Sequence, residues 1–218
     1  MIDDAPKIEV RTPLRRPSAD QVAALRGMPT GNVVDALGGN GGMDFRIKPV
    51  VAAQHTFCGM AVTCNAGPAD NLAVLATLEH LAAGDVIVAA CNGYTGCAVT
   101  GDLVLGMARN GGAVAFVTDG CVRDIPGIAG VGLPCFAVGV TPNSPAREGP
   151  GTVGFPIVVG GVAVDTGDIV LGDQDGVVVV PHDRIDAVIA RLATVRAAEA
   201  DLEAKVKAGL RVPAFMQK

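Results

Sequence analysis

The sequence predicts a mixed α/β sandwich, and three observations carry this prediction. Half of the 218 residues are hydrophobic, so a chain of this length can bury a sizeable core. The 29 glycines and 14 prolines are spread along the chain, which is typical of many short elements joined by tight turns. Helical and strand patterns alternate in the middle of the chain, whereas the later strands follow one another directly. This order favours a sheet with both parallel and antiparallel pairs, in a single domain over residues 1–218.

Two helices are expected in the N-terminal segment 1–48. The first spans Ser18–Arg26, because Ser18 can cap its first turn and apolar residues follow at helical spacing. The second spans Asn32–Leu37 and ends at the glycines around Asn40.

From residue 50 onward the pattern changes to short runs rich in β-formers. Strands are expected at Gly59–Asn65, Asp85–Ala90, Ala113–Thr118, Phe136–Val140, Ile157–Val164, Asp168–Leu171 and Val177–Val180. Two helices, Asn71–Leu81 and Asp102–Asn110, lie between them. Asp175 and Gly176 form the dipeptide of a tight hairpin turn, so we interpret Asp175 as structural.

A long amphipathic helix is expected at the C-terminal end, over residues 183–208. Its apolar residues recur in steps of three and four: Ile185, Val188, Leu192, Val195, Leu202 and Val206. Glu199 stands where this stripe requires an apolar residue. A carboxylate on a buried stripe is costly unless a cation, a donor or a metal satisfies it. Two interpretations stay open: a functional carboxylate, or an exposed helix end where Glu199 is solvated.

Charge and composition exclude several classes of function. The net charge of -5 and the lack of a Lys/Arg run argue against nucleic-acid binding and against an anionic membrane surface. The apolar runs are too short to span a bilayer, and the N-terminus lacks the apolar region of a signal peptide. We therefore expect a cytoplasmic protein that acts on a small molecule. The six cysteines are expected to be reduced and buried. The three histidines are scattered and do not suggest a zinc site, so the ligands of any bound metal should be oxygens.

Two carboxylates and an arginine are expected to meet near the middle of the chain. Asp102 follows Gly101 and opens a helix; the chain returns as a strand and then leaves it in the loop of Arg123 and Asp124. Both ends should lie on one edge of the sheet. Asp102 and Asp124 could hold a hard divalent cation through oxygens and waters, and this cation would stabilise an enolate.

The start of the helix at Asp102 offers an anion site. The backbone N–H groups of Leu103 and Val104 would point at a bound carboxylate, and Arg123 could add a bidentate contact. A 2-oxo acid fits such a site. The spacing alone also allows a simpler interpretation, in which Asp102 is a helix-start charge and Arg123 pairs with Asp124 on the surface.

Asp102, twenty intervening residues and then Arg123-Asp124 resemble the signature of the RraA-like family. This family includes class II 4-hydroxy-4-methyl-2-oxoglutarate and 4-carboxy-4-hydroxy-2-oxoadipate aldolases. The resemblance covers about residues 30–210, through further blocks at Asp35–Gly39, Ile47–Pro49, Gly84–Val86, Pro156–Val162, Gly167–Val170 and Asp175–Pro181.

The resemblance implies a fold like the phosphohistidine swivelling domain, assembled into trimers or dimers of trimers with active sites between subunits. It implies that Asp124 binds Mg²⁺ or Mn²⁺ directly and that Asp102 reaches the metal through water. Gly101, Arg123 and the amides of Leu103 and Val104 would then hold pyruvate.

The resemblance also implies an acidic residue from the neighbouring subunit's C-terminal helix near the metal. Glu199 is the residue expected there, as a catalytic group beside Arg123 and Asp102. The implied reaction cleaves 4-hydroxy-4-methyl-2-oxoglutarate or a related 4-hydroxy-2-oxo acid to pyruvate and a second oxo acid, with oxaloacetate decarboxylation as a side activity. A Schiff-base mechanism has only Lys48 as a mid-chain candidate, and a structural role suits Lys48 better. The alternative function is that of the family's regulatory members, which bind and inhibit a ribonuclease.

Overall fold

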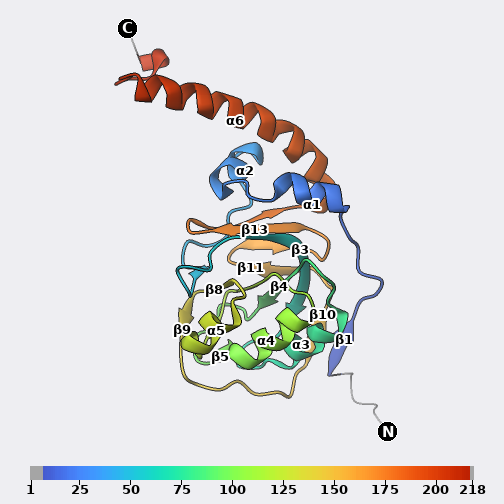
Figure 1. Ribbon diagram of the computed structural model, residues 1–218. Helices are drawn as coiled ribbons and strands as arrows, with labels where there is room; N and C mark the ends of the chain where they lie inside the picture. The colour runs from blue at the N-terminus through green and yellow to red at the C-terminus, as the bar shows by residue number, and fades with distance from the viewer. Residues whose placement is uncertain (1–6, 217–218) are drawn as a thin grey trace.

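The computed structural model describes residues 7–216. Within these residues a mixed sheet of nine strands lies at the centre, with helices packed outside it (Figure 1). The main path through the sheet is β1 (Ile8–Val10), β10 (Gly151–Val153), β3 (Phe57–Asn65), β4 (Asp85–Ala90), β6 (Ala115–Thr118), β8 (Cys135–Ala137) and β2 (Lys48–Pro49). The hairpin of β13 (Ile169–Asp173) and β14 (Gly176–Val180) joins the sheet through β3. The mixed α/β architecture predicted from the sequence is confirmed.

Strand β3 organises the sheet, because its two halves pair with different neighbours. Its first half pairs with β13 and its last two residues pair with β10, both in the antiparallel sense. Along its other edge β3 pairs in parallel with β4, and β6 and β8 continue the parallel run. Residues 57–64 are all buried, as expected for a strand that is covered on both faces.

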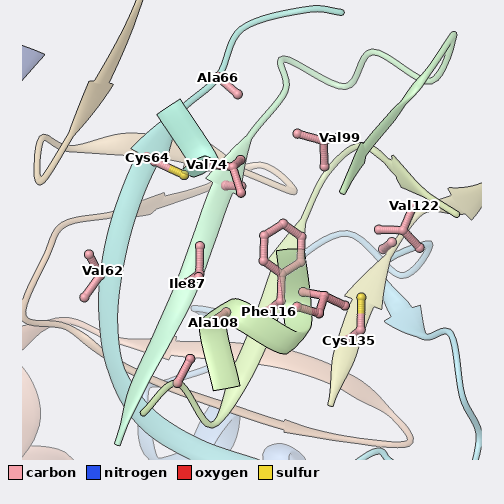
Figure 2. Packing of buried hydrophobic residues seen from close by; sticks show 14 of the residues in the cluster. Val62, Cys64, Ala66, Val74, Ile87, Val99, Ala108, Phe116, Val122 and Cys135 are labelled. Carbon is pink, nitrogen blue, oxygen red and sulfur yellow. The ribbon is translucent and has the colours of Figure 1, made fainter. Parts of the chain in front are cut away.

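One side of the sheet is covered by α3 (Leu72–Thr77), the 3-10 turn η1 (Leu78–His80), α4 (Asp102–Asn110) and α5 (Ile125–Val131). Figure 2 shows the core on this side: the ring of Phe116 lies among side chains that include Ile87 of β4, Cys135 of β8 and Ala108 of α4. Phe116 and Ala108 are fully buried. This packing fixes α4 against the sheet and so fixes the position of its first turn.

The opposite face is covered by the hairpin of β11 (Ile157–Val159) and β12 (Val162–Val164), which packs over the middle of the sheet. The helices α1 (Ala19–Leu25), α2 (Thr30–Ala36) and, after the turn η2 (His182–Arg184), α6 (Ile185–Lys207) pack over β13 and β14 (Figure 1). They cover the same face as α4, because Ile169 beneath them pairs with Met60, which belongs to the core under α4. Ser18 caps α1 in a reciprocal capping box with Gln21, as the sequence predicts. A last turn, η3 (Ala214–Met216), follows α6.

The apolar stripe of α6 is buried only in its first half. Ile185, Val188 and Leu192 are buried against α1, α2 and the hairpin, whereas Leu202 and Val206 are 49% and 55% exposed. In Figure 1 the end of α6 extends beyond α1 and α2. The helix is therefore longer than the surface that this chain offers to cover it.

Several sequence expectations need correction. The expected strand Phe136–Val140 is split at Val138 into β8, in the main sheet, and β9 (Gly139–Val140), in another sheet. The segment 1–48 is not purely helical, because β1 pairs with β10. The helix α5 was not expected, since its sequence holds a proline and two glycines; the proline stands in the first turn, where no N–H is needed.

The cysteines and the hairpin turn agree with the sequence analysis. All six cysteines are free and buried, and burial raises the pKa of Cys64 and Cys135 to about 12. Asp175 lies in the turn between β13 and β14. Among residues 7–216, no helix has the length and apolar character needed to cross a membrane.

Candidate functional site

The candidate site lies where two neighbouring parallel strands end. β5 (Ala98–Thr100), β7 (Cys121–Val122) and β9 form a small parallel sheet, with Ala98 opposite Cys121 and Thr100 opposite Val122. Gly101 and Asp102 follow β5, and Arg123 follows β7, where its backbone N–H donates to the Thr100 carbonyl at 3.1 Å. The carboxyl ends of parallel strands share one edge, which is a common position for ligand sites.

The predicted meeting of Asp102 with Arg123 and Asp124 is thus present, but by a different route from the one expected. β6 ends at Thr118 in the main sheet, and the chain turns through Asp119 before it enters β7. The Asp119 carboxylate accepts from the backbone N–H of Cys91 at 2.6 Å and from that of Gly93 at 2.9 Å. Asp119 therefore has a structural role, because it holds the turn that leads into β7.

The side chains gather around an open pocket of about 90 Å³. Its lining residues are Asn71, Ala98, Thr100, Gly101, Asp102, Leu103, Val104, Arg123, Asp124, Pro145 and Arg147. Every predicted site residue except Glu199 belongs to this set. Drug-sized ligands occupy pockets of roughly 300 Å³ or more, so this pocket fits only a small molecule or part of one.

Asp124 is held in an unusual backbone conformation. It has a left-handed φ of 64° and stands at the N-cap position of α5, where its side chain caps no backbone N–H. A non-glycine residue in this region is uncommon and is often found at functional sites. Its Oδ2 accepts from Arg123 Nε at 3.2 Å and lies so close to Gly101 that a Cβ there would be 2.4 Å away. Gly101 is therefore required for the position of Asp124.

Arg123 is oriented by two contacts. Nε donates to Asp124, and one terminal nitrogen donates to Ser144 Oγ at 2.6 Å. The Arg123 and Asp124 side chains are 35% and 45% exposed, and an ion pair with that exposure stabilises a fold by only about 0–1 kcal/mol. Folding stability alone therefore gives little reason for this arrangement.

Asp102 is packed against α5 and bonded to its own helix. Its Oδ1 accepts from the Leu103 N–H at 2.8 Å, and a Cβ at Gly127 would fall 2.1 Å from its Oδ2. The Leu103 amide is thus already used, whereas the Val104 amide has no hydrogen-bond partner among the described residues. Of the two backbone amides predicted to bind an anion, only that of Val104 is available to a ligand in this structure.

The donor set suits a hard cation, although one chain supplies few ligands. Asp102 Oδ2 and Asp124 Oδ1 are carboxylate oxygens that make no hydrogen bond within residues 7–216. The same residues contain no group of three or more His, Cys, Asp or Glu that could enclose a metal. Mg²⁺ commonly uses one or two carboxylates and keeps several waters, so two aspartates fit it.

Glu199 lies away from this pocket within one chain. It is exposed on α6, and Figure 1 places α6 at the opposite end of the molecule from α4 and α5. Its Oε2 accepts from Asn32 Nδ2 at 2.6 Å, and Asn32 is a buried residue of α2. The premise of an unpaired carboxylate on a buried stripe is therefore wrong within one chain: Glu199 has a neutral partner and is open to solvent.

Sequence reasoning missed one wall of the pocket, which carries Asn71 and Arg147. Asn71 is 3% exposed and its Oδ1 is buried without a hydrogen-bond partner. A buried unpaired oxygen costs about 1–3 kcal/mol, so a ligand or water that donates to it would be favoured. Asn71 stands just before α3, and the Asp-Asn pair that it forms with the preceding residue is a helix-start signal in the sequence. Arg147 lies in a loop, and no sequence signal marks it as a pocket residue.

Comparisons with known proteins identify the family of the chain. The family model described as "RraA-like: Aldolase/RraA" matches residues 30–179. A protein of Halalkalibacterium halodurans named "Putative 4-hydroxy-4-methyl-2-oxoglutarate aldolase" is 36% identical over 189 residues, which are 87% of this chain and 88% of that protein.

Two solved structures extend the comparison. An uncharacterized protein from Pseudomonas syringae pv. tomato has a TM-score of 0.80 at 26% identity, and the alignment covers 92% of this chain and 94% of that one. A structure described as "the RNA-processing inhibitor RraA from Thermus thermophilis" has a TM-score of 0.65 at 28% identity, with 71% and 93% covered.

Proposed function

The chain belongs to the RraA-like family, and we propose that it is a divalent-metal-dependent lyase that cleaves a carbon–carbon bond in a small 2-oxo acid to release pyruvate. The observation that carries this proposal is the junction of β5 and β7, which gathers Asp102, Arg123 and Asp124 at one small pocket. The named aldolase among the relatives supports the same reaction class. The proposed substrate is 4-hydroxy-4-methyl-2-oxoglutarate or a related 4-hydroxy-2-oxo acid, with oxaloacetate decarboxylation as a side activity.

Arg123 and the first turn of α4 would hold the carboxylate of the 2-oxo acid. Arg123 is fixed by Asp124 and Ser144 and offers a planar set of donors that matches a carboxylate. The Val104 amide points from the helix start, where the helix dipole favours a negative charge. Gly101 lets the substrate approach the backbone, because it has no side chain.

Asp124 and, through water, Asp102 would hold Mg²⁺ or Mn²⁺ beside this carboxylate. Their oxygens are the ligands that these cations prefer. The cation would supply positive charge next to the 2-oxo oxygen, where negative charge develops as the bond breaks.

The bond cleavage needs a group that takes a proton. The C4 hydroxyl loses its proton, the C3–C4 bond breaks, and C4 becomes the carbonyl carbon of the second product. The electron pair stays on C3 as the enolate of pyruvate, which is then protonated at C3. We assign the proton transfer to Asp102, whose Oδ2 remains free of hydrogen bonds within the described chain, acting directly or through one water.

We further propose that the site is completed by a second copy of the chain, in a trimer or hexamer. Two exposed apolar surfaces support this: Leu202 and Val206 on the end of α6, and Leu103 and Met107 on α4, beside the pocket. Glu199 stands on the first of these surfaces. We assign it to the pocket of a neighbouring subunit, as an acidic group near the metal.

A pyruvate-release assay on a panel of 2-oxo acids tests the proposed reaction. We expect release with Mg²⁺ or Mn²⁺, none after exhaustive chelation, and recovery when the metal is restored. Asp124→Asn should abolish metal-dependent turnover with little change in melting temperature, because Asp124 is an exposed residue. Undiminished release without metal, or a borohydride-trapped substrate adduct, would overturn the metal mechanism. Inactivity on the whole panel, together with tight binding to a ribonuclease, would favour the regulatory alternative, which the solved inhibitor structure supports.

Subunit complementation tests the role of Glu199. Glu199→Ala and Asp124→Ala should each be inactive, and mixed oligomers should regain part of the activity, because some interfaces then join an intact Asp124 to an intact Glu199. Mixtures with verified subunit exchange that stay inactive would contradict a site shared between subunits.

A further inference from the structure

A second hollow lies at the amino ends of three parallel strands of the main sheet, and we call it the amino-end groove. Phe57 opens β3, Val114 precedes β6 and Pro134 precedes β8. The groove has a volume of about 620 Å³, which lies within the range of roughly 300–1,000 Å³ for sites that bind small molecules. Its lining residues are Arg26, Gly27, Thr56, Phe57, Cys58, Arg109, Ala113, Val114, Gly132, Leu133 and Pro134.

The amino-end groove is separate from the candidate pocket at the ends of β5 and β7, because the two share no lining residue. Helix α4 joins them: Asp102 stands in its first turn at the pocket, and Arg109 stands in its last turn at the groove. A helix of nine residues is about 13 Å long. A small ligand in the groove therefore does not take the place of the 2-oxo acid.

The floor of the groove is apolar and well packed. Phe57 and Leu133 are buried, and Val114 and Pro134 are half-buried. The ring of Phe57 packs edge-on against that of Phe136, with the ring centroids 5.1 Å apart. The apolar part of a ligand would therefore meet a preformed surface, and binding would cost little ordering of the protein.

Two exposed arginines stand at this floor, and neither is neutralised by a carboxylate. Within residues 7–216 the Arg26 guanidinium makes neither a hydrogen bond nor an ion pair. One terminal nitrogen of Arg109 donates to the Val131 carbonyl, and Arg109 makes no ion pair within the same residues. The lining residues include no Asp or Glu, although the chain has 22 acidic residues and a net charge of -5. The groove therefore combines an apolar floor with unpaired positive charge.

Helix dipoles account for only part of this arrangement. Arg109 stands in the last turn of α4 and Arg26 directly follows α1, which are positions where a cation is favoured. The dipoles do not explain why the hollow at these helix ends is apolar and lacks a carboxylate. A ligand that carries both an apolar body and a negative charge would satisfy both features.

We propose that the amino-end groove binds an organic carboxylate with an apolar body. Arg26 and Arg109 donate to the carboxylate, which matches the planar fork of a guanidinium. The apolar body packs on Phe57, Val114 and Leu133. Inorganic phosphate would leave this floor uncovered, and an uncharged apolar molecule would leave the arginines unpaired, so both should bind more weakly.

Calorimetric titration of the full-length protein with octanoate, in the presence of Mg²⁺, tests the proposal. Octanoate should bind about tenfold or more tightly than octanamide, which has the same chain without the charge, and than inorganic phosphate, which lacks the chain. Arg26→Ala should weaken octanoate binding about fivefold or more and change octanamide binding less than about twofold. Arg123→Ala should leave octanoate binding unchanged, because Arg123 lies in the other pocket.

Thr56 offers a matched pair of variants, because it is exposed and lines the groove. Thr56→Glu brings a carboxylate to the arginines and should weaken octanoate binding about tenfold or more, whereas the neutral Thr56→Gln should change it less than about threefold.

Three results would overturn the proposal: no binding of octanoate, equal binding of octanoate and octanamide, or loss of octanoate binding in Arg123→Ala. A change of oligomeric state in Thr56→Glu but not in Thr56→Gln, measured by sedimentation, would instead assign the groove to an interface between copies and would also overturn it. Since the titration measures binding without turnover, its failure leaves the proposed lyase reaction unaffected.

Discussion

Replacing Gly101 by alanine should inactivate the site while leaving the fold intact. A Cβ at this position would lie 2.4 Å from Asp124 Oδ2, whereas an ordinary carbon–oxygen contact is about 3.3 Å or longer. The carboxylate must therefore move by roughly 1 Å, a displacement that costs about 10²-fold in rate, or about 2.7 kcal/mol. The backbone of Gly101, with φ -148° and ψ -171°, is extended, so alanine adds no backbone strain.

Gly106→Ala is the matched control, because it adds the same methyl group to the same helix. Its Cβ would meet only Val131 Cγ2 at 3.9 Å, an ordinary contact. Alanine is favoured over glycine inside a helix by about 0.5–1 kcal/mol, so this variant should be slightly more stable and fully active. Pyruvate release and melting temperature should be measured for both variants. Wild-type kcat/KM in Gly101→Ala, or equal losses in both, would refute the reasoning that Gly101 makes room for Asp124.

Two further variants test the walls of the pocket. Arg123→Lys keeps the charge but loses the planar fork, so kcat/KM should fall about tenfold or more, from losing about 1.5 kcal/mol of charge-assisted hydrogen bonding; near-normal kinetics would show that Arg123 does not hold the substrate. Asp70→Asn should lower the free energy of unfolding by about 1–3 kcal/mol at neutral pH. The folded pKa of Asp70 is lowered, so its contribution is present above the usual carboxylate range near pH 4 and is lost as the pH falls through the folded pKa. Melting curves from pH 7 to pH 3 should therefore show the difference in melting temperature between wild type and Asp70→Asn closing in acid. A constant difference would contradict a stabilising role for the hydrogen bonds that the Asp70 carboxylate accepts from the backbone of Glu148 and Gly149.

The helices and strands that could be predicted are those with a hydrophobic pattern that runs over six or more consecutive residues. β4 and α4 begin and end at the residues expected from the sequence, Asp85–Ala90 and Asp102–Asn110. The first is a continuous apolar run and the second is a helical repeat closed by glycine. Because α4 was placed correctly, Asp102 and the two residues after it were also correctly placed at a helix start.

The small sheet beneath the site could not be predicted in the same way. β5, β7 and β9 are three, two and two residues long, too short to show an alternating pattern. Their pairing depends on where the main sheet places Thr118 and Ala137. The meeting of Asp102 with Asp124 was therefore anticipated from an approximate topology, while the pairing that produces it was not.

The contact between Asp70 and the loop that carries Arg147 lies even further from what local patterns can predict. The bond from Glu148 to Asp70 joins residues 78 positions apart, and neither residue carries a motif. Arg147 gains its position from that contact and from the backbone bonds that join Ala146 to Ala69 and Asn71. A loop arginine is ordinary in a sequence, and it becomes a candidate ligand-binding group only when its neighbours are seen to be fixed at a pocket.

The helix α6 shows what periodicity can and cannot determine. The spacing of its apolar residues correctly predicts that they share one face of the helix. Periodicity carries no information about which other part of the protein packs against that face. Within one chain the cover ends at Val195, which is half-buried, and the stripe continues exposed through Leu202 and Val206. Glu199 lies between these two halves and accepts a hydrogen bond from the neutral amide of Asn32, so its negative charge has no counterion among residues 7–216. A second copy that covers the exposed half would bury this charge, and burial without a nearby cation is costly. A covering surface that brings positive charge would offset this cost, and this requirement is why we assign Glu199 to the pocket for which we propose a divalent cation.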